Sequence, residues 1–235
     1  TGFIGDPLLL QARLTVGRLP LDGEARVEAR ILSPRTGMGT LLSKFDMPGQ
    51  TEIKSEPGAT IGQVKLERLL LLPEFVKEIQ PVEDRITLRD RGDGVYEVVY
   101  EQTKMAGIYT VEFIINGKSE TAGAFSRTET ASTVLRVGPA DPDASEITAK
   151  LHGTGGRRSV LLSIRPVDKE GNLLGPDYAD RVRFLLNGKP ASSTKDRGDG
   201  SYTARTLIRT GSDPMLEVQV AGQTILRTTL KQIVR

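Results

Sequence analysis

Acidic residues recur in two glycine-rich turns of the sequence, and carboxylates in such turns could bind calcium. Residues 90–94 and 196–200 both read Asp-Arg-Gly-Asp-Gly. Calcium takes six to eight oxygen ligands at about 2.3–2.6 Å, whereas each turn contributes only two carboxylates. A third oxygen-rich segment lies near residue 170, and no EF-hand spacing occurs. The candidate calcium ligands are therefore Asp90, Asp93, Asp196, Asp199, Asp168 and Asn172.

The same two turns contain Arg-Gly-Asp, the tripeptide that integrins bind in adhesive loops. A structural interpretation competes with adhesion, because the first Asp can accept a hydrogen bond from the N–H two residues on. Glycine supplies the positive φ angles of such a turn. A three-residue motif without context also matches by chance in many proteins. We therefore favour turn-forming roles for Gly92, Gly94, Gly198 and Gly200.

The composition removes several kinds of chemistry. The sequence has one histidine, no cysteine and no tryptophan, which excludes disulfides, thiolate nucleophiles and Cys/His zinc clusters. His152 has neither a second histidine nor a Gly-x-Ser-x-Gly motif to work with, so a surface position is favoured. Gly117-Lys118-Ser119 lacks the earlier glycine of a phosphate-binding loop. We expect no catalytic residue, no metal site beyond the calcium candidates, and no cofactor.

Length and charge limit the partners. The chain has 235 residues, of which 37% are hydrophobic and 26% charged, and its formal net charge is +2. This is enough apolar material for about two ordinary domains. The balanced charge gives no sign of a nucleic-acid partner. The apolar run at residues 69–72 is far shorter than the roughly 20 residues of a membrane span, so we expect no membrane insertion.

The Asp-rich turn belongs to an internal repeat. Residues 90–96 and 196–202 match at six of seven positions. After each copy come a short alternating segment, a break containing glycine, a second alternating segment and a long final one. The segment Gly138–Asp143 contains two prolines and cannot continue a central strand. We therefore expect two domains, at residues 1–138 and 139–235.

Period-2 alternation between turn residues predicts strands throughout both repeats. The predicted strands are Leu8–Val16, Ala25–Leu32, Arg85–Leu88, Val95–Tyr100, Ile108–Ile115, Ala124–Val137, Ile147–Leu151, Ser159–Arg165, Arg181–Leu186, Ser201–Ile208, Met215–Val220 and Thr224–Val234. One apolar and one charged face is typical of antiparallel sheets that cover a core on one side. Asn116-Gly117 and Asn187-Gly188 tolerate positive φ angles and are predicted to be hairpin turns.

The turn motif resembles a known family. Asp-x-Gly-Asp-Gly-x-Tyr, followed by an alternating strand and Ala-Gly-x-Tyr-x-Val, is similar to immunoglobulin-like repeats of the filamin type, and residues 90–111 match it closely. The second repeat departs from it at residues 213–216. Residues 167–176 resemble the B–C turn of such repeats, and residues 123–127 resemble paired modules that follow von Willebrand factor A-type domains in bacterial surface proteins. The resemblance implies an all-β fold of two tandem immunoglobulin-like β-sandwiches.

Residues 47–84 interrupt the first repeat and have no counterpart in the second. Apolar residues at helical spacing predict a short helix at Gln63–Leu72 that ends at Pro73. We expect this helical insertion to cap an open edge or end of the first sandwich.

Three tyrosines are assigned to the fold. Tyr109 follows the Ala-Gly break and resembles the tyrosine corner of sandwich domains, whose hydroxyl bonds upstream backbone. Tyr96 and Tyr202 are expected to pack their rings at the start of the preceding strand.

These features predict non-catalytic modules of a larger secreted or cell-surface protein, outside the cell or in the periplasm. Their partner would be another protein or a neighbouring domain of the same polypeptide, such as a von Willebrand factor A-type domain. One alternative is a module that binds a protein strand or a glycan, although 5% aromatic residues and no tryptophan weigh against a glycan. Another is an accessory domain of an extracellular enzyme. The oligomeric state stays open.

Overall fold

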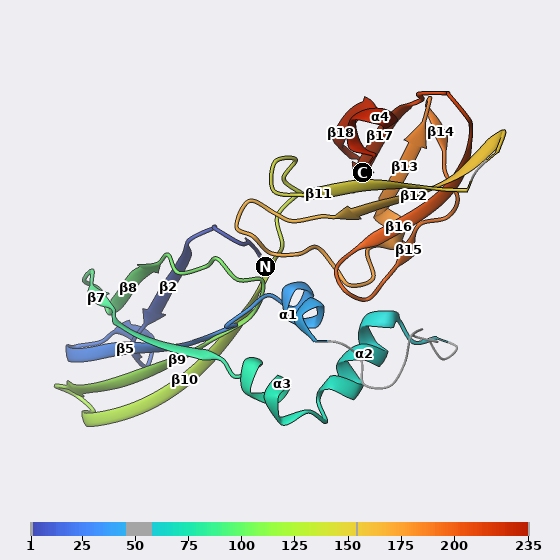
Figure 1. Ribbon diagram of the computed structural model, residues 1–235. Coiled ribbons are helices and arrows are strands. Elements are labelled where there is room, and N and C mark those ends of the chain that lie inside the picture. Colours follow the sequence, from blue (N-terminus) through green and yellow to red (C-terminus); the bar gives the residue numbers. More distant parts are fainter. Residues whose placement is uncertain (1, 46–57, 154, 235) are drawn as a thin grey trace. The chain divides into compact units, whose positions relative to one another are not determined.

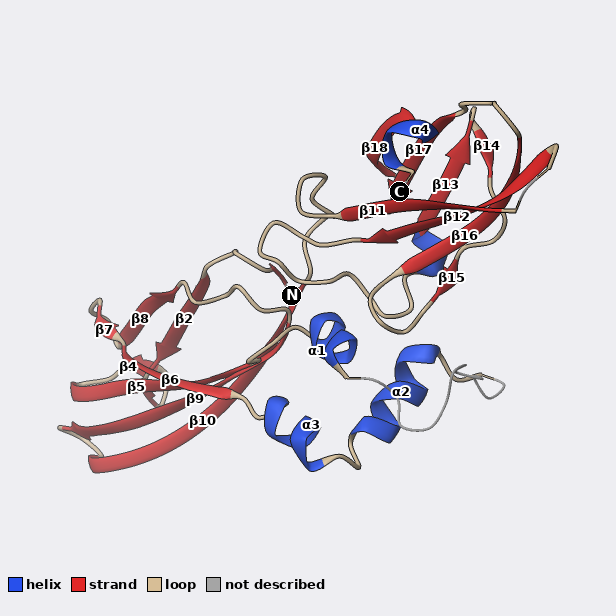
Figure 2. Cartoon of the chain, viewed as in Figure 1, coloured by secondary structure: helices blue, strands red, loops and turns tan. Residues whose placement is uncertain are grey.

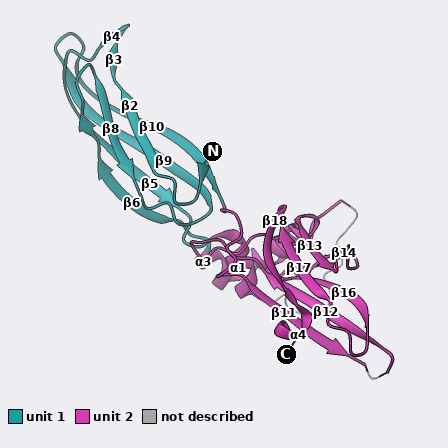
Figure 3. Cartoon of the chain, turned by 90° about the horizontal axis from the view of Figure 1, so that it is seen from above, with its two compact units in different colours: residues 1–36, 79–136 teal, residues 37–78, 137–235 magenta. Residues whose placement is uncertain are grey.

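The computed structural model describes residues 2–45, 58–153 and 155–234, and most of them lie in strands (Figures 1 and 2). The chain divides into two compact units, coloured in Figure 3. Unit 1 contains Thr1–Thr36 and Ile79–Arg136, and unit 2 contains Gly37–Glu78 and Val137–Arg235. The second segment of unit 1 ends at Arg136, two residues before the expected domain boundary at 138. The sheets of both units are antiparallel except for one short parallel pair at residues 2–3 and 135–136, and the predicted all-β sandwich fold is confirmed.

Unit 2 has the strand order of an immunoglobulin-like sandwich. One sheet has the order β11-β12-β16-β15, with strands Glu146–His152, Arg157–Arg165, Tyr202–Arg209 and Lys195–Asp196. The other has the order β14-β13-β17-β18, with strands Lys189–Pro190, Val182–Leu186, Met215–Val220 and Gln223–Thr229. In immunoglobulin letters these are A-B-E-D facing C′-C-F-G. Apolar residues at alternate positions of the two inner faces, such as Leu162 and Val218, form one buried core.

Two short helices belong to the same sandwich. A 3-10 turn at Ala179–Arg181 leads into β13, and α4 (Leu230–Ile233) ends the chain after β18. The predicted strand Thr224–Val234 therefore stops at Thr229. The last turn brings Val234 to a parallel bridge with Ala149 of β11.

Unit 1 repeats much of this arrangement. One sheet has the order β2-β8-β7, with strands Leu8–Arg13, Val95–Tyr100 and Arg89–Asp90. The other has the order β1-β10-β9-β5-β6, with strands Gly2–Phe3, Gly123–Arg136, Gly107–Ser119, Gly23–Ser33 and Val82–Thr87. A small hairpin of β3 (Thr15–Val16) and β4 (Leu19–Pro20) follows β2. The core includes Val27, Ile31 and Tyr109.

The shared turn sequence aligns the two units strand by strand. Strands β7 to β10 of unit 1 correspond to β15 to β18 of unit 2. Strand β2 corresponds to β12, because each pairs with the strand that follows the Asp-rich turn. Strand β5 likewise corresponds to β13, and β6 to β14. Unit 1 has no counterpart of β11 among its described residues.

The two Asn-Gly steps differ in structure. Asn187 and Gly188 have φ angles of 49° and 75° and join β13 to β14 in the expected hairpin turn. The prediction at Asn116-Gly117 is wrong, since both residues lie within β9 and pair with β10. A Cβ atom at Gly117 would lie 2.6 Å from the carbonyl oxygen of Glu24, so this glycine permits a close approach of β5.

Between β5 and β6, where the second repeat has only the β13–β14 turn, the described residues form three helices. They are α1 (Met38–Lys44), α2 (Ile61–Leu69) and α3 (Pro73–Glu78). The helix expected at Gln63–Leu72 is α2, which begins two residues earlier because Thr60 and Gln63 form a capping box. It also ends three residues earlier than expected, at Leu69. Pro73 begins α3, a position that suits its fixed φ. The part of the predicted insertion at residues 47–57 lies outside the described residues.

The helices group with unit 2 and not with the first repeat to which the sequence assigned them. Helices α1 and α2 contact loops of unit 2. The expected insertion is also too long at its end, because β6 already begins at Val82.

Candidate functional site

Helices α1 and α2 pack against two loops of unit 2, and we call this arrangement the helix dock. The loops are residues 166–178, between β12 and β13, and the Asp-rich turn at residues 196–200. The hydroxyl of Thr40 on α1 accepts a hydrogen bond from the N–H of Leu173 at 3.1 Å. The N–H of Gly62, in the first turn of α2, donates to Asp177 Oδ1 at 3.3 Å. Polar contacts thus join both helices to the loop between β12 and β13.

A buried lysine anchors α2 to the Asp-rich turn. Lys65 is 4% exposed, and its Nζ donates to the carbonyl oxygen of Gly198 at 2.7 Å. Burial of an ammonium group is costly unless hydrogen-bond acceptors surround it. Gly198 and Gly200 have φ angles of 71° and 81°. Because the backbone of this turn takes that left-handed form, its carbonyl group is available to Lys65.

Glycines allow the helices to approach the loop backbone. A Cβ atom at Gly39 would lie 2.5 Å from the carbonyl oxygen of Leu173 and closer still to that of Gly175. A Cβ atom at Gly62 would lie 2.7 Å from the Asp177 carboxylate and would overlap the Pro176 ring. A larger residue at Gly39 must displace the loop backbone, and one at Gly62 must displace the side chains of Pro176 and Asp177. The dock therefore depends on the absence of side chains at both positions.

A buried carboxylate shapes the loop that receives the helices. Asp168 is fully buried, and its Oδ1 accepts hydrogen bonds from the N–H groups of Asn172 at 2.9 Å and Glu170 at 3.0 Å. Its Oδ2 accepts from the N–H of Gly138 at 3.3 Å. Asp168 and Asn172, both calcium candidates from the sequence, therefore organise the backbone that carries Leu173.

The carboxylates of the Asp-rich turns also accept backbone hydrogen bonds. Asp90 accepts from the N–H of Gly92 at 2.8 Å, and Asp196 accepts from the N–H of Gly198 at 2.7 Å. Asp199 accepts from the N–H of Ser201 at 2.9 Å, while Asp93 is exposed with a φ of 51°. The six calcium candidates lie in three separate loops. Across residues 2–45, 58–153 and 155–234, no three His, Cys, Asp or Glu side chains gather as metal ligands.

Asp196, in the Asp-rich turn of the helix dock, lies where a negative charge is unfavourable. Burial raises the pKa of its carboxyl group above the usual value, and the nearby carboxylates of Asp177 and Asp199 act in the same direction. Backbone N–H groups of Gly198 and Asp177, the latter at 2.7 Å, oppose this shift. The Asp196 carboxylate is therefore energetically unfavourable where it lies, but it binds the backbone of both loops of the dock.

The three tyrosines lie in the cores. The Tyr109 hydroxyl donates to the carbonyl oxygen of Met105 at 2.9 Å, which is the bond expected of a tyrosine corner. Tyr96 is buried in unit 1. Tyr202 is completely buried, its hydroxyl donates to the carbonyl oxygen of Leu174 at 3.1 Å, and burial raises its pKa. Tyr202 therefore supports the helix dock from inside the sandwich.

The arginines of the Arg-Gly-Asp tripeptides each contact a side chain of the strand that follows the turn. Arg91 Nε lies 3.0 Å from Glu97 Oε1, and Arg197 Nε donates to the Thr203 hydroxyl at 3.0 Å. Both partners belong to the strand after the turn, so the side chains extend along the sheet.

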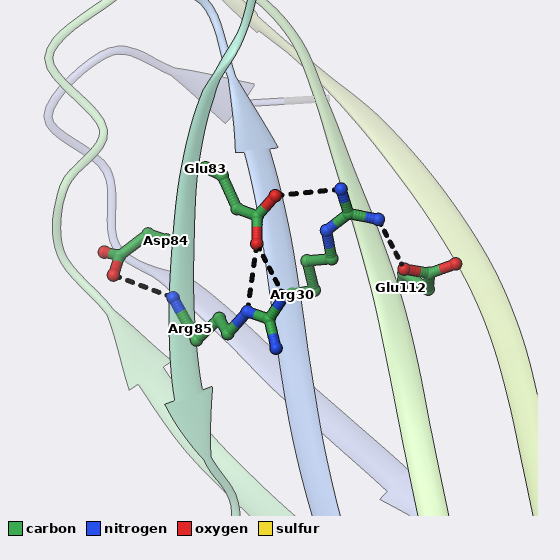
Figure 4. Close-up of polar contacts among 5 residues, drawn as sticks. All are labelled: Arg30, Glu83, Asp84, Arg85 and Glu112. Atoms are coloured by element: carbon green, nitrogen blue, oxygen red, sulfur yellow. Dashed lines mark hydrogen bonds and ion pairs between the residues drawn. The ribbon is translucent and has the colours of Figure 1, made fainter.

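A network of charges on unit 1, which the sequence analysis did not single out, joins β5, β6 and β9 (Figure 4). The Arg30 guanidinium bridges Glu83 at 2.8 Å and Glu112 at 3.1 Å. Arg85 reaches the second oxygen of Glu83 at 2.9 Å. Glu83 and then Glu112 raise the pKa of Arg30, while Arg30 and then Arg85 lower the pKa of Glu83. The network ties three strands together across their solvent-facing surface.

Replacing Glu83 with Gln is expected to cause a small loss of stability at pH 7 that vanishes in acid. Because folding lowers its pKa, the Glu83 carboxylate contributes fully above the unfolded value of about 4.3. The contribution is lost as the pH falls through the lower folded value. Urea unfolding of wild type and variant should therefore differ at pH 7, converge as the pH falls from the unfolded value through the lower folded value, and differ less in 1 M salt. The control is Glu101→Gln, and a difference that persists at low pH would contradict the assignment.

Comparison with known proteins yields distant likenesses. No protein-family model and no curated protein matches this sequence. Among solved structures, the chain is similar to FdeC, an Escherichia coli adhesin, with 20% identity, a TM-score of 0.35, and coverage of 61% of this chain and 46% of that chain. It is also similar to native alpha-2-macroglobulin from Escherichia coli, domains MG0-NIE-MG1, with 11% identity, a TM-score of 0.23, and coverage of 97% and 59%. The chain thus spans less than two thirds of either.

The helices are short relative to the thickness of a membrane, and α2 has nine residues. In the described part of the chain, none of them combines the length and the apolar character that crossing a bilayer requires.

Proposed function

We propose that this chain is a non-catalytic, load-bearing segment of a larger secreted or cell-surface protein. Its two immunoglobulin-like units would space or support a neighbouring domain of the same polypeptide or a protein partner. The observation that carries the proposal is the helix dock, because the first repeat sends α1 and α2 into unit 2 before its own sheets are complete. A von Willebrand factor A-type domain is the neighbour that the resemblance to filamin-type bacterial modules favours.

The helix dock changes the route of tension through the chain. The polypeptide passes between the units three times, after residues 36, 78 and 136. Tension applied at the two ends enters unit 2 at Gly37 through the docked helices. Residues 79–136 of unit 1 are joined to unit 2 at both of their ends, so they form a loop that the tension bypasses. A single linker between two contiguous domains would transmit force through every residue of the first domain.

Force spectroscopy on the whole chain, pulled from both ends, tests the proposal. When unit 1 unfolds and the helices stay docked, only the 36 residues before Gly37 extend, which adds about 120–130 Å at 3.3–3.6 Å per residue. If the dock yields with unit 1, all residues up to 136 extend and add about 450–490 Å. We expect the short step. A long step in the wild-type chain would show that the dock bears no load and would contradict the proposal.

We also propose that the chain works without a metal or another cofactor. The carboxylates of the Asp-rich turns accept hydrogen bonds from backbone N–H groups, so the fold does not require calcium to balance their charge. The melting temperature should be the same in 5 mM calcium and in excess EDTA, within about 1 °C. A rise with calcium, of the size that binding linkage produces, would instead identify one of the loops as a calcium site.

A further inference from the structure

Among its described residues, unit 1 has no strand that corresponds to β11, the strand beside β12 in unit 2. In unit 2, β11 pairs antiparallel with β12 from Glu146 opposite Arg165 to His152 opposite Ser159. Strand β12 thus has a neighbour on each side, β11 and β16. Its counterpart β2 pairs only with β8, and none of the described residues pairs with its other edge (Figure 1). Such an edge presents free backbone N–H and C=O groups.

The facing sheet is open on the same side. Strand β10 pairs with β9 along its length, but β1 covers its other edge only at Leu135 and Arg136. The side chains of Arg127, Glu129 and Ala131 line the space between the sheets, yet all three are exposed. In unit 2, β11 and the last residues described, which meet at the bridge between Ala149 and Val234, close this side. Ile225 of β18, the counterpart of β10, is accordingly buried. Unit 1 therefore remains open where unit 2 is closed.

The opening is a groove of about 530 Å³ that lies between strands β9 and β10 on one side and, on the other, the end of β2 with the hairpin that follows it. Apolar side chains of the core, Phe113 and Ile115, line it together with Phe125 near the β9–β10 turn. Gln11 and Arg13 line it on the side of β2. The groove thus combines an apolar floor with an unpaired strand edge, the two features by which sheets capture extended peptides.

We propose that this groove binds an extended segment of another polypeptide, which pairs antiparallel with β2 as β11 pairs with β12. Strand β11 indicates which side chains such a segment would carry. In β11, Ala149 is completely buried, and Ile147 and Leu151 also pack against the core. The partner is thus a strand of about six or seven residues with small or branched apolar residues at every second position. Arg13 and Arg127 outnumber Glu129 along the groove, which favours an acidic residue among the polar positions. This binding site is separate from the load-bearing role and does not depend on it.

Hydrogen exchange on the whole chain, with a peptide of the β11 sequence (residues 145–153) as probe, tests the proposal. A saturating concentration should slow amide exchange in residues 8–13 by about tenfold or more. The variant Ala131→Arg places a long side chain in the groove and should abolish this protection. The matched control Thr128→Arg carries the same charge on the opposite face of β10, away from the groove lining, and should bind the peptide like wild type. Equal melting temperatures of the two variants would show that both fold.

Three outcomes would overturn the proposal. The first is unchanged exchange in residues 8–13 at saturating peptide, or equal protection in Ala131→Arg. The second is protection limited to residues 157–165, which would mean that the peptide replaces β11 in unit 2. The third is a concentration-dependent dimer in sedimentation that protects residues 8–13 without peptide, because the occupant would then be a second copy of this chain.

Discussion

Replacing Gly39 with valine is expected to release the helices from unit 2 and to destabilise that unit by about 1–3 kcal/mol, the usual cost of overpacking. The new side chain would meet the backbone oxygens of Leu173 and Gly175, which cannot move without displacing the loop that Asp168 holds. The Thr40–Leu173 hydrogen bond should then be lost. Hydrogen exchange should accelerate at Leu173 and in α1 and α2, and urea should unfold unit 2 at a lower concentration.

A glycine with free space beside it provides the matched control. A Cβ atom at Gly156 would meet no atom within 4 Å, so Gly156→Val should leave the exchange of α1 and α2 unchanged. The Gly39→Val variant should also convert the short extension step of unit 1 into the long one. Normal protection of the helices in that variant would refute the close backbone approach on which the dock depends.

Replacing Tyr202 with alanine is expected to have the largest effect on stability, about 3–5 kcal/mol. The ring is completely buried at the centre of unit 2, so its loss leaves a cavity that packed strands cannot close. Tyr202→Phe keeps the ring but leaves the buried carbonyl of Leu174 without this donor, which costs about 1–3 kcal/mol. Thermal and urea unfolding should rank the proteins as wild type, phenylalanine variant and alanine variant.

Tyr178 is the matched control for this series. Its hydroxyl meets Arg181 at the surface, so Tyr178→Phe should change the unfolding free energy by less than about 0.5 kcal/mol. If Tyr202→Phe proved as harmless as Tyr178→Phe, the Tyr202 hydroxyl would have no part in holding the loop between β12 and β13.

Strands and turns could be predicted because their signals are local. Alternation located β8 and β17 to the residue, and the repeated Asp-Arg-Gly-Asp-Gly identified matching turns in the two units. Asn187-Gly188 adopts its expected conformation, whereas Asn116-Gly117 does not. The dipeptide permits a turn, but the pairing of β9 with strands on both sides prevents one there.

The helix dock could not be predicted because its contacts are not local. An apolar stripe shows that a helix buries one face, but not which surface covers it. Lys65 has the appearance of a solvent-facing residue in such a pattern, and the turn that receives it lies in the other repeat. A signal was present in Gly39 and Gly62, since glycine within a helix costs about 1 kcal/mol and often marks a close approach. The open edge of β2 has no sequence signal, because alternation does not show which strands are neighbours.

The order in which a ribosome makes this chain gives the helix dock a further consequence. Leu173 and Gly198 each follow their partners on α1 and α2 by 133 residues. At about 5–20 residues per second, the helices wait about 7–27 s for the loops that receive them. Until then the Lys65 ammonium group lacks the carbonyl oxygen of Gly198, and the Thr40 hydroxyl lacks the N–H of Leu173. The helices of the nascent chain therefore cannot dock before the second repeat emerges.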